Sequence, residues 1–292
     1  MSTAVAEIVD IPEDAYHRDD IYARPSLSKS VIQILLTKSP AHAWAAHPKN
    51  PDCIPRADEK KFDAGTAAHN LFLEGRDDSI VIVDADAFRT NAAKAARDEA
   101  YAAGKTPLLT KDYAGVQAMA AAIRPQLDLI RADPPLFTDG RPEQTLVWEE
   151  DGVVCKARLD WLRDDYLAID DLKTTTASAA PEAWPKTMLG FGGDLQMAMY
   201  LRGARAVLGI TPEFRFVAVE SSPPYALTPF SLAPDALAQA DERIEYAIRM
   251  WRRCLASGDW PGYPRRVCYI QSPAWAENQW AEREYRDSGV AA

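Results

Sequence analysis

Two aspartates and a lysine in the middle of the chain have a spacing that could build a catalytic site. Residues 166–174, YLAIDDLKT, predict a short β-strand on which Asp171 and Lys173 leave the same face, because they are two positions apart. Residues 153–163 alternate with period two and predict a second, half-buried strand, whose charged face carries Asp160. If the two strands pair, two carboxylates and an ammonium group can share one surface.

The segment between these strands decides whether the carboxylates meet. Asp164 and Asp165 favour a turn, so we expect a hairpin. A two-residue loop puts Asp160 opposite Ile169 and makes Asp171 its diagonal neighbour, roughly 7–8 Å away. A four-residue loop puts Asp160 directly opposite Asp171, whereas an odd loop sends the two carboxylates to opposite faces. Only a loop with an even number of residues builds a site.

Converging carboxylates indicate a hard cation with oxygen ligands, since they repel each other unless a cation lies between them. Mg²⁺ would acidify a water molecule and bind a phosphate oxygen, while Lys173 could orient that water or neutralise developing charge. These groups suit hydrolysis of a phosphodiester. The alternative is a polar hairpin face on a solvated sheet, which is a common structure.

Two predicted helices could bring further polar groups to the same place. A helix over 56–75, ended by Gly75, has His69 in its core-facing stripe, where a histidine is either a hydrogen-bonded core residue or a ligand. A second helix is capped by Asp194 and ends at Gly209. It projects Gln196 and Tyr200 from one face, either as substrate-binding groups or as ordinary polar decoration.

The rest of the chain supplies the scaffold. Ser28 is the predicted N-cap of a helix that ends before Pro40, although Ser28 and Lys29 could instead bind a phosphate there. Glu143 begins a strand that precedes the hairpin; it is the one further acid that could lie near a metal, but we expect it at the surface. Other expected elements are an edge strand at 80–83, helices within 90–130, a strand at 213–220 that closes the sheet and a helix at 234–256.

Length and composition fit one large domain. We expect a flexible N-terminus over 1–20 and a single domain over 21–285, divided into a helical part (21–135), a catalytic core (136–257) and an aromatic tail without regular period (258–285). The tail should pack on the domain or on a neighbouring subunit. The net charge of −10 argues against a surface coated with non-specific DNA-binding groups, but it permits a local basic channel.

Apolar runs and cysteines bear on membrane contact and on the presence of an iron–sulfur cluster. No apolar run approaches the ~20 residues of a membrane span, and the acidic N-terminus does not resemble a signal peptide, so we expect no membrane contact and a cytoplasmic location. The four cysteines are scattered without any C-x-x-C motif. We therefore predict no iron–sulfur cluster.

Several motifs, taken in order, resemble a known family. These are an R-P-x-L-S element, G-T-x-x-H at 65–69, Asp160, D-x-K at 171–173, Q-x-x-x-Y at 196–200 and a Y-P plus P-x-W-A tail. Together they resemble the RecE-like exodeoxyribonuclease VIII family, in the RecB-like branch of the PD-(D/E)xK nuclease superfamily, over about residues 24 to 280. The resemblance implies an α/β fold with a restriction-endonuclease-like core, namely a small mixed sheet flanked by helices, and an N-terminal helical extension.

The same resemblance implies a reaction and a set of site residues. The reaction is Mg²⁺-dependent 5′ to 3′ digestion of linear double-stranded DNA, with Mn²⁺ as a substitute ion, leaving 3′ overhangs for a RecT-like single-strand annealing recombinase in a bacterial or phage-infected cell. Relatives form rings, which implies a trimer or tetramer. Implied metal ligands are His69, Asp160, Asp171 and the Leu172 carbonyl; implied catalytic residues also include Lys173, Gln196 and Tyr200; possible DNA contacts are Arg24, Ser28, Lys29, Thr174 and Arg202.

Two other functions remain compatible with the sequence. A structure- or site-specific endonuclease could use the same core, because a fold does not fix its substrate. A non-catalytic DNA-binding or assembly subunit is the other alternative, and the presence of His69, both aspartates and Lys173 argues against it.

Overall fold

The computed structural model describes residues 5–53 and 63–289, and its main unit is built around a mixed seven-stranded sheet. The order β1-β5-β6-β7-β8-β9 forms the sheet, and β2 pairs with β6. The strands are β1 (Ala6–Val9), β2 (Ser26–Leu27), β5 (Gly140–Glu150), β6 (Val153–Arg163), β7 (Ala168–Thr175), β8 (Glu213–Glu220) and β9 (Leu227–Phe230). A separate parallel pair consists of β3 (Ile80–Val83) and β4 (Thr106–Leu109).

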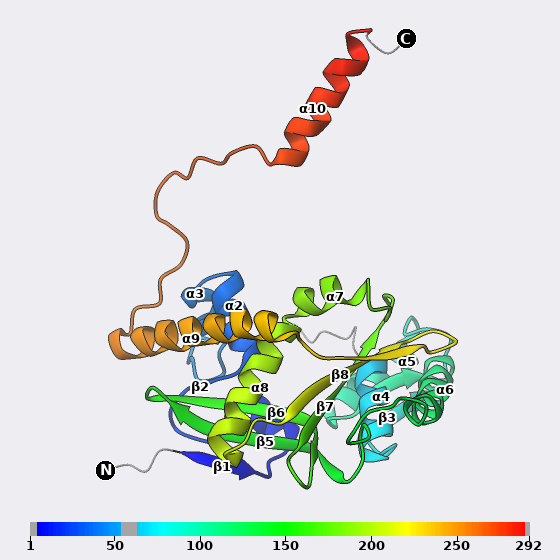
Figure 1. The fold of residues 1–292 in the computed structure, drawn as a ribbon. Helices are drawn as coiled ribbons and strands as arrows, with labels where there is room; N and C mark the ends of the chain where they lie inside the picture. The colour runs from blue at the N-terminus through cyan, green and yellow to red at the C-terminus, as the bar shows by residue number, and fades with distance from the viewer. Residues whose placement is uncertain (1–4, 54–62, 290–292) are drawn as a thin grey trace. The chain divides into compact units, whose positions relative to one another are not determined.

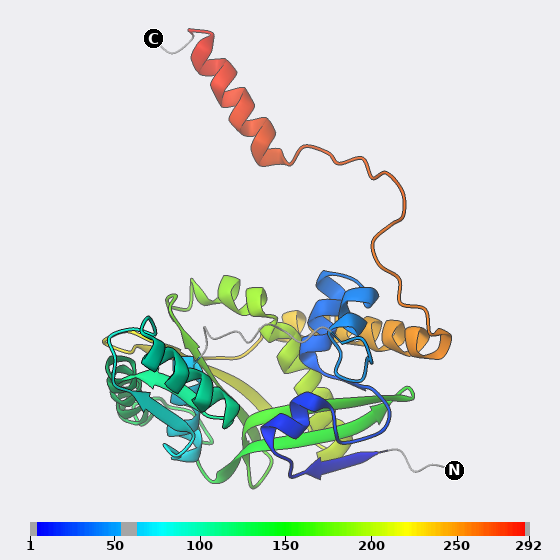
Figure 2. The same cartoon turned by 180° about the vertical axis from the view of Figure 1, so that it is seen from behind.

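Helices cover both faces of this sheet, which confirms the predicted α/β architecture (Figures 1 and 2). On one side α8 contacts β5 and β6, with α2 and α9 behind it, while α4 contacts β7 and packs with α6 and the β3–β4 pair. The helices are α1 (Glu13–Arg18), α2 (Lys29–Thr37), α3 (Pro40–Ala45), α4 (Asp63–His69), α5 (Asn91–Ala102), α6 (Thr110–Leu127), α7 (Trp184–Phe191), α8 (Gly193–Leu208), α9 (Pro234–Ser257) and α10 (Ala274–Asp287).

Strand β7 contributes to two hydrophobic cores. Its residue Ile169 packs in the core under α8, together with Leu159 and Phe216. Its residue Leu172 packs in the second core with Val217, under α4 and α6. Successive residues of a strand point to opposite faces, so one strand can supply both cores. A strand buried on both faces is held rigidly, which suits a strand that carries site residues.

A tight turn sets the register of β5 and β6. Asp151 and Gly152 both have positive φ (50° and 79°), as a two-residue type I′ turn requires, and Glu150 pairs with Val153 across it. The antiparallel pairing continues without a shift to the far end of both strands. There, the flanking pairs Pro142↔Trp161 and Gln144↔Leu159 place residue 143 opposite residue 160.

The β6–β7 connection has four residues, 164–167, rather than the two of our first interpretation. Trp161 pairs with Asp170 and Leu162 with Ile169, which is the register of the four-residue alternative. The predicted strand start at residue 166 is also wrong, because Tyr166 has a left-handed φ of 62° and belongs to the turn. Asp160 and Asp171 are therefore directly opposite each other.

The strands β6 and β7 separate just beyond these two pairs. From Ala168 to Thr175, β7 pairs in parallel with β8. On the other side of β7, the Leu172 N–H donates to the carboxylate Oδ2 of Asp160 (2.9 Å) instead of to a backbone carbonyl of β6. The sheet thus opens at the position where the two aspartates face each other.

Residues 5–20, within the segment 1–20 that we expected to be flexible, are built into the fold. Strand β1 pairs antiparallel with β5, and α1 follows it. Asp19, which is buried, accepts hydrogen bonds from the Ser26 N–H (2.9 Å) and from Lys156 Nζ (2.6 Å). Lys156 is buried in turn, so the prediction that β6 is half-buried is also wrong: the N-terminal segment covers its charged face.

Several helix boundaries agree with the predictions and others differ. Ser28 is the N-cap of α2, Gly75 ends the turn of π-helix (Asn70–Glu74) that follows α4, and Gly209 ends α8. Residues 56–62 of the predicted helix lie outside the described residues. Asp194 lies in the first turn of α8 rather than at its N-cap, and it binds Arg243 Nη1 of α9 (2.5 Å).

The sheet edge and the tail also depart from the predictions. Strand β8 does not close the sheet, because β9 pairs with its free side. Residues 261–292 form a second unit; part of the tail that we expected to be irregular is the helix α10. Its Trp275, Trp280 and Tyr285 are exposed. Among the described residues, none of the helices combines the length and apolar character that a membrane span needs.

Candidate active site

A cleft of about 1400 Å³ opens where β6 and β7 separate. Its walls come from α1 and the segment before it, the N-terminus of α2, α4, the π-helical turn, β5, β6, β7, α7 and α8. The polar side chains that line the cleft include His69, Glu143, Arg158, Asp160, Lys173 and Tyr200. Two buried residues, Asp171 and Gln196, lie directly behind Lys173.

Three of these side chains form a group that could hold a metal ion. His69 Nε2 lies 3.1 Å from Asp160 Oδ2, and His69 Nδ1 lies 3.4 Å from Glu143 Oε1. One ligand atom from each of the three residues lies within 4.8 Å of the others. An imidazole nitrogen and two carboxylate oxygens are a donor set that suits a divalent cation.

A close helix–strand contact brings His69 to this group. A Cβ atom on Gly65 would lie 2.9 Å from Thr174 Oγ1, so α4 can approach β7 this closely only because residue 65 has no side chain. His69 follows one turn later on the same helix, on the side that faces the cleft. The Gly-x-x-x-His spacing therefore has a steric explanation.

The two aspartates of the hairpin have different surroundings. Asp160 is half-buried, whereas Asp171 is fully buried and forms an ion pair with Lys173 through Oδ1. Gln196 of α8 donates a hydrogen bond to the other oxygen, Oδ2. Lys173 Nζ also lies 3.9 Å from Asp160 Oδ2. Asp171 thus orients the lysine, and Gln196 orients Asp171.

Burial and mutual repulsion govern the protonation of this cluster. Desolvation, reinforced by the nearby Asp160 carboxylate, raises the pKa of Asp171 to about 7. Desolvation disfavours the charged form of His69, but Asp160 and Glu143 outweigh it and raise the pKa of His69 to about 9. At neutral pH His69 is therefore protonated between the carboxylates of Asp160 and Glu143. A cation that binds there would replace that proton.

The structure brings together most of the predicted site residues. His69, Asp160, Lys173 and Tyr200 line the cleft, and so does Leu172, whose N–H donates to Asp160. Lys29 and Thr174 line it as well. Lys29 Nζ donates to the Phe191 carbonyl (2.6 Å), which fixes the start of α2 to the end of α7.

Three predicted DNA contacts lie elsewhere: Ser28, Arg24 and Arg202 are not among the residues that line the cleft. Arg24 Nη2 pairs with Glu149 (2.6 Å). Arg202 is mostly buried and joins Glu150 of β5 to Asp241 of α9, at 2.7 Å in each case. These two arginines connect secondary-structure elements.

Glu143 is the site residue that sequence reasoning misplaced. We expected it at the surface, but only 21% of its side chain is exposed and it faces His69. The signal was present in the Asp151-Gly152 turn, whose two-residue geometry fixes the β5–β6 register and places residue 143 opposite Asp160.

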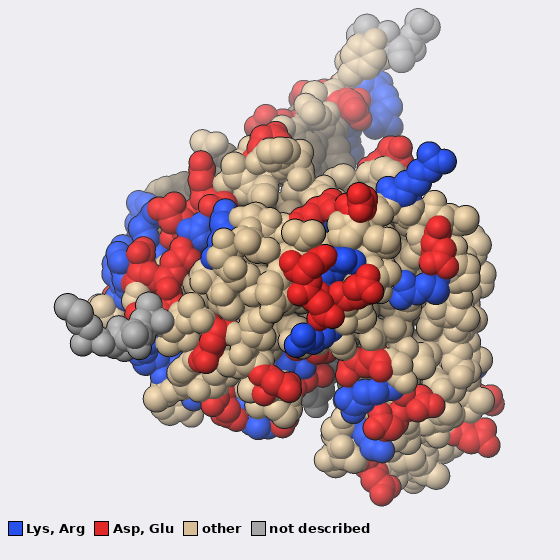
Figure 3. Space-filling view, turned by 60° about the horizontal axis from the view of Figure 1, so that its bottom comes forward, with Lys and Arg blue, Asp and Glu red and all other residues tan. Residues whose placement is uncertain are grey.

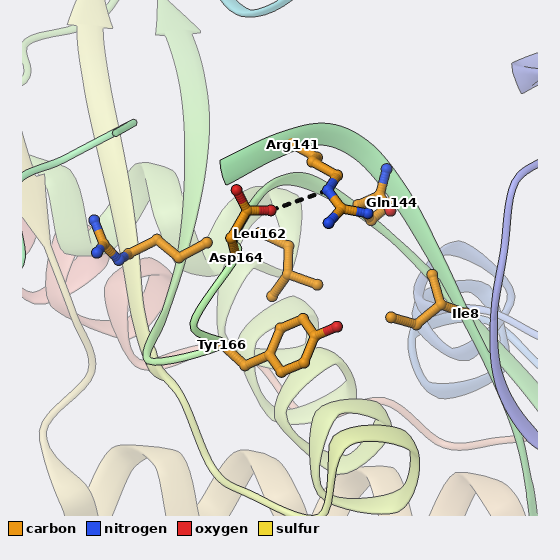
Figure 4. Close-up of a pocket in the computed structure, with 7 residues that line it drawn as sticks. Ile8, Arg141, Gln144, Leu162, Asp164 and Tyr166 are labelled. Carbon is orange, nitrogen blue, oxygen red and sulfur yellow. Dashed lines mark hydrogen bonds and ion pairs between the residues drawn. The ribbon is translucent and has the colours of Figure 1, made fainter. Parts of the chain in front are cut away.

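Two other features of the described surface can be compared with this cleft. On the face shown in Figure 3, the described acidic and basic side chains are interspersed, and they form no broad basic area. A second hollow, beside the Arg141–Asp164 ion pair and Tyr166, has a volume of only about 10 Å³ (Figure 4). That volume is about the minimum for one water molecule. It is too small for a substrate.

The fold and site together define the class of protein: a nuclease fold of the PD-(D/E)xK type, with a candidate metal group at the opening between two strands. The chain belongs to the family described as "PDDEXK-like domain of unknown function (DUF3799)", which matches residues 28–273. No curated protein matches the sequence.

Solved structures that are similar to the chain include two with low sequence identity. One is from Eubacterium rectale and is described as a "Putative exonuclease"; it is 12% identical, the match covers 92% of this chain and 98% of that one, and the TM-score is 0.61. This likeness shows a common fold. The other, SSO0001, is 14% identical, the match covers 65% of this chain and 85% of that one, and the TM-score is 0.27.

The contact at Gly65 gives a first prediction. Gly65→Ala should weaken Mn²⁺ binding about tenfold, because the new methyl group would push α4 and His69 away from β7. Adding Thr174→Ala should restore the affinity by removing the atom that the methyl group meets. Mn²⁺ titration followed by electron paramagnetic resonance measures both. Unchanged affinity in Gly65→Ala would contradict the steric explanation.

Proposed function

We propose that this chain is a divalent-metal-dependent deoxyribonuclease that hydrolyses linear double-stranded DNA from an end. The observation that supports this most is the convergence of His69, Glu143 and Asp160 beside Lys173 in one cleft. Membership of a PDDEXK-like family and a fold shared with a protein described as an exonuclease agree with it. The more specific proposal is 5′ to 3′ digestion that leaves 3′ overhangs.

Mg²⁺ or Mn²⁺ would be held by His69, Glu143 and Asp160, with Asp171 and the Leu172 carbonyl as the further ligands that the family resemblance implies. When bound, such an ion supplies charge stabilisation at the phosphate and a more acidic water. The Leu172 N–H fixes the orientation of the Asp160 carboxylate. The protein therefore presents its donors in a fixed arrangement.

Lys173 is the group that would act on the reacting phosphate. Burial lowers the pKa of its ammonium group, but Asp171 and Asp160 outweigh this and raise that pKa, so Lys173 carries its charge at neutral pH. Held by Asp171, the ammonium can donate to the attacking water or to a phosphate oxygen that gains charge. Tyr200, whose pKa is raised by burial, would remain a neutral hydrogen-bonding phenol.

A ring-shaped trimer or tetramer and a RecT-like annealing partner complete the proposal. A ring would let only DNA ends reach the cleft and would convert weak phosphate contacts into processive digestion. It would also reconcile a net charge of −10 with a DNA substrate, because a local surface suffices. Sedimentation analysis tests the ring: a monomer that still degrades long DNA processively would contradict it.

The need for an end separates this function from an endonuclease on the same core. Linear duplex should be degraded with Mg²⁺ and spared with EDTA, whereas the same DNA as a covalently closed circle should resist. Activity should fall steeply between ~50 and ~200 mM salt, because phosphate contacts supply most of the affinity. Gel assays on end-labelled DNA measure this. Rapid cutting of relaxed closed circles would favour the endonuclease, and no Mg²⁺-stimulated cleavage at all would favour a non-catalytic subunit.

A further inference from the structure

Arg158 lies beside the candidate metal group without being one of its ligands. Its Nε donates to Glu143 Oε2 (2.5 Å), and its Nη1 donates to the Ile11 carbonyl (2.9 Å) and to Thr145 Oγ1 (3.2 Å). Only 15% of the side chain is exposed, and it lines the cleft. One planar guanidinium thus connects a carboxylate, a backbone carbonyl and a hydroxyl.

The register of β5 and β6 explains why these groups meet. Arg158 pairs with Thr145, and the same register puts Glu143 opposite Asp160. Arg158 and Asp160 are two residues apart on β6 and so leave the same face. Arg158 is therefore the diagonal neighbour of Glu143, within reach of a long side chain. The arrangement that completes the metal group also places an arginine next to it.

The two oxygens of Glu143 have separate partners. Oε2 accepts from Arg158, while Oε1 lies 3.4 Å from His69 Nδ1. The Glu143 backbone has a left-handed φ of 56°, which is uncommon for a glutamate in a strand. With one oxygen held, the carboxylate cannot rotate freely, so the other oxygen is directed at the group.

We propose that Arg158 is a positioning residue for the metal site, which holds Glu143 with one oxygen directed toward His69 and Asp160. The inference rests on the proposed function and adds a residue to it. A guanidinium suits the task because it donates several hydrogen bonds in a fixed plane, which lysine cannot do. Partners of metal ligands typically contribute 10–100-fold in metal affinity.

The N-terminal segment takes part through Ile11. This residue lies between β1 and α1, and its carbonyl holds the guanidinium on the side away from Glu143. β1 ends with Val9 paired to Thr145, so the pairing of β1 brings the Ile11 carbonyl close to Arg158. The competing role for Arg158 is a direct contact with a DNA phosphate, since it lines the cleft.

Mn²⁺ titration of the full chain without DNA, followed by electron paramagnetic resonance, tests the proposal. Arg158→Gln should weaken Mn²⁺ binding 10–100-fold, and Arg158→Lys should not restore it fully. Thr145→Val, which removes one acceptor at constant volume, should weaken binding by a smaller factor. Arg141→Gln is the matched control on β5; it breaks the exposed pair with Asp164 and should leave Mn²⁺ affinity unchanged.

DNA affinity, measured with Ca²⁺ in place of Mg²⁺, distinguishes the two roles. If Arg158→Gln keeps its Mn²⁺ affinity but loses DNA affinity, with a salt slope smaller by about one, Arg158 is a phosphate contact and the proposal is overturned. Unchanged Mn²⁺ affinity with unchanged DNA affinity also overturns it and leaves the proposed function intact. If Arg158→Gln does not fold, the Mn²⁺ affinities of Arg158→Lys and Thr145→Val test the proposal in its place. No Mn²⁺ binding by the unmodified protein would overturn the proposed function and, with it, this inference.

Discussion

Asp160→Asn is expected to reduce Mg²⁺-dependent DNA cleavage at least about a thousandfold, which corresponds to about 4 kcal/mol of transition-state stabilisation. The substitution removes the charge that faces His69 Nε2 and Lys173. It preserves the shape of the side chain and an oxygen that can accept from the Leu172 N–H. Initial rates on end-labelled linear duplex measure the effect.

The fold of this variant should survive. Asp160 loses its attraction to His69 and Lys173, but its repulsion of Asp171 is relieved as well. We expect Tm to change by no more than about 4 °C, the shift that about 1 kcal/mol produces in a domain of this size. A variant that unfolds at ordinary temperature, or one that keeps near-normal activity, would show that the site is wrongly assigned.

Asp170 provides a matched control for this prediction. It is buried in β7 next to Asp171 but faces the opposite side of the strand, where it accepts from Arg215 Nε (2.6 Å) and from the Phe137 N–H (2.7 Å). Asp170→Asn should lower Tm, because it weakens a buried ion pair. Its remaining folded fraction should still cleave DNA with the same dependence on Mg²⁺ concentration.

Lys173→Met should lower single-turnover cleavage by about 10²–10³-fold while DNA affinity stays nearly the same. Positioned proton transfer and charge stabilisation contribute on this scale, and methionine keeps the length of the side chain without its charge. Asp171 would lose its counter-charge, so a lower Tm is also expected. Single-turnover assays with excess protein, paired with DNA binding in Ca²⁺, separate the two effects.

Lys94→Met, at an exposed lysine of α5, is the control and should behave like the unmodified protein. A loss confined to DNA affinity in Lys173→Met would assign the lysine to binding of the DNA backbone instead. Equal losses in both variants would mean that overall charge, rather than the position of Lys173, governs cleavage.

Local sequence patterns predicted the parts of the fold that depend on local physics. The bounds of β6 were predicted correctly, because alternation of side chains is a direct consequence of strand geometry. Gly209 was predicted as the end of α8, because a left-handed residue after a helix favours glycine. The sequence predicted that Asp160 and Asp171 meet only if the loop between their strands has an even number of residues. The turn residues alone did not show whether that loop has two residues or four.

Features that depend on distant contacts escaped prediction. The strand at 153–163 was expected to be half-buried, yet Asp19, 137 positions from Lys156, neutralises that lysine inside the protein, and the Tyr16 carbonyl accepts a hydrogen bond from it. The N-terminal segment was expected to be flexible, but the contacts that stabilise it, with β5, Lys156 and Arg158, involve residues far away in the sequence. The position of Glu143 depends on the register of the whole β5–β6 hairpin, which a motif of a few residues does not determine.

The incorporation of the N-terminal segment has a practical consequence for making shortened versions of this protein. Deleting residues 1–20, which hydropathy alone would suggest trimming, would remove the outer strand of the sheet, the carboxylate that neutralises Lys156 and the carbonyl that holds Arg158. Such a protein could be expressed and still be inactive. Shortened versions meant for assays should therefore keep β1, Ile11 and Asp19.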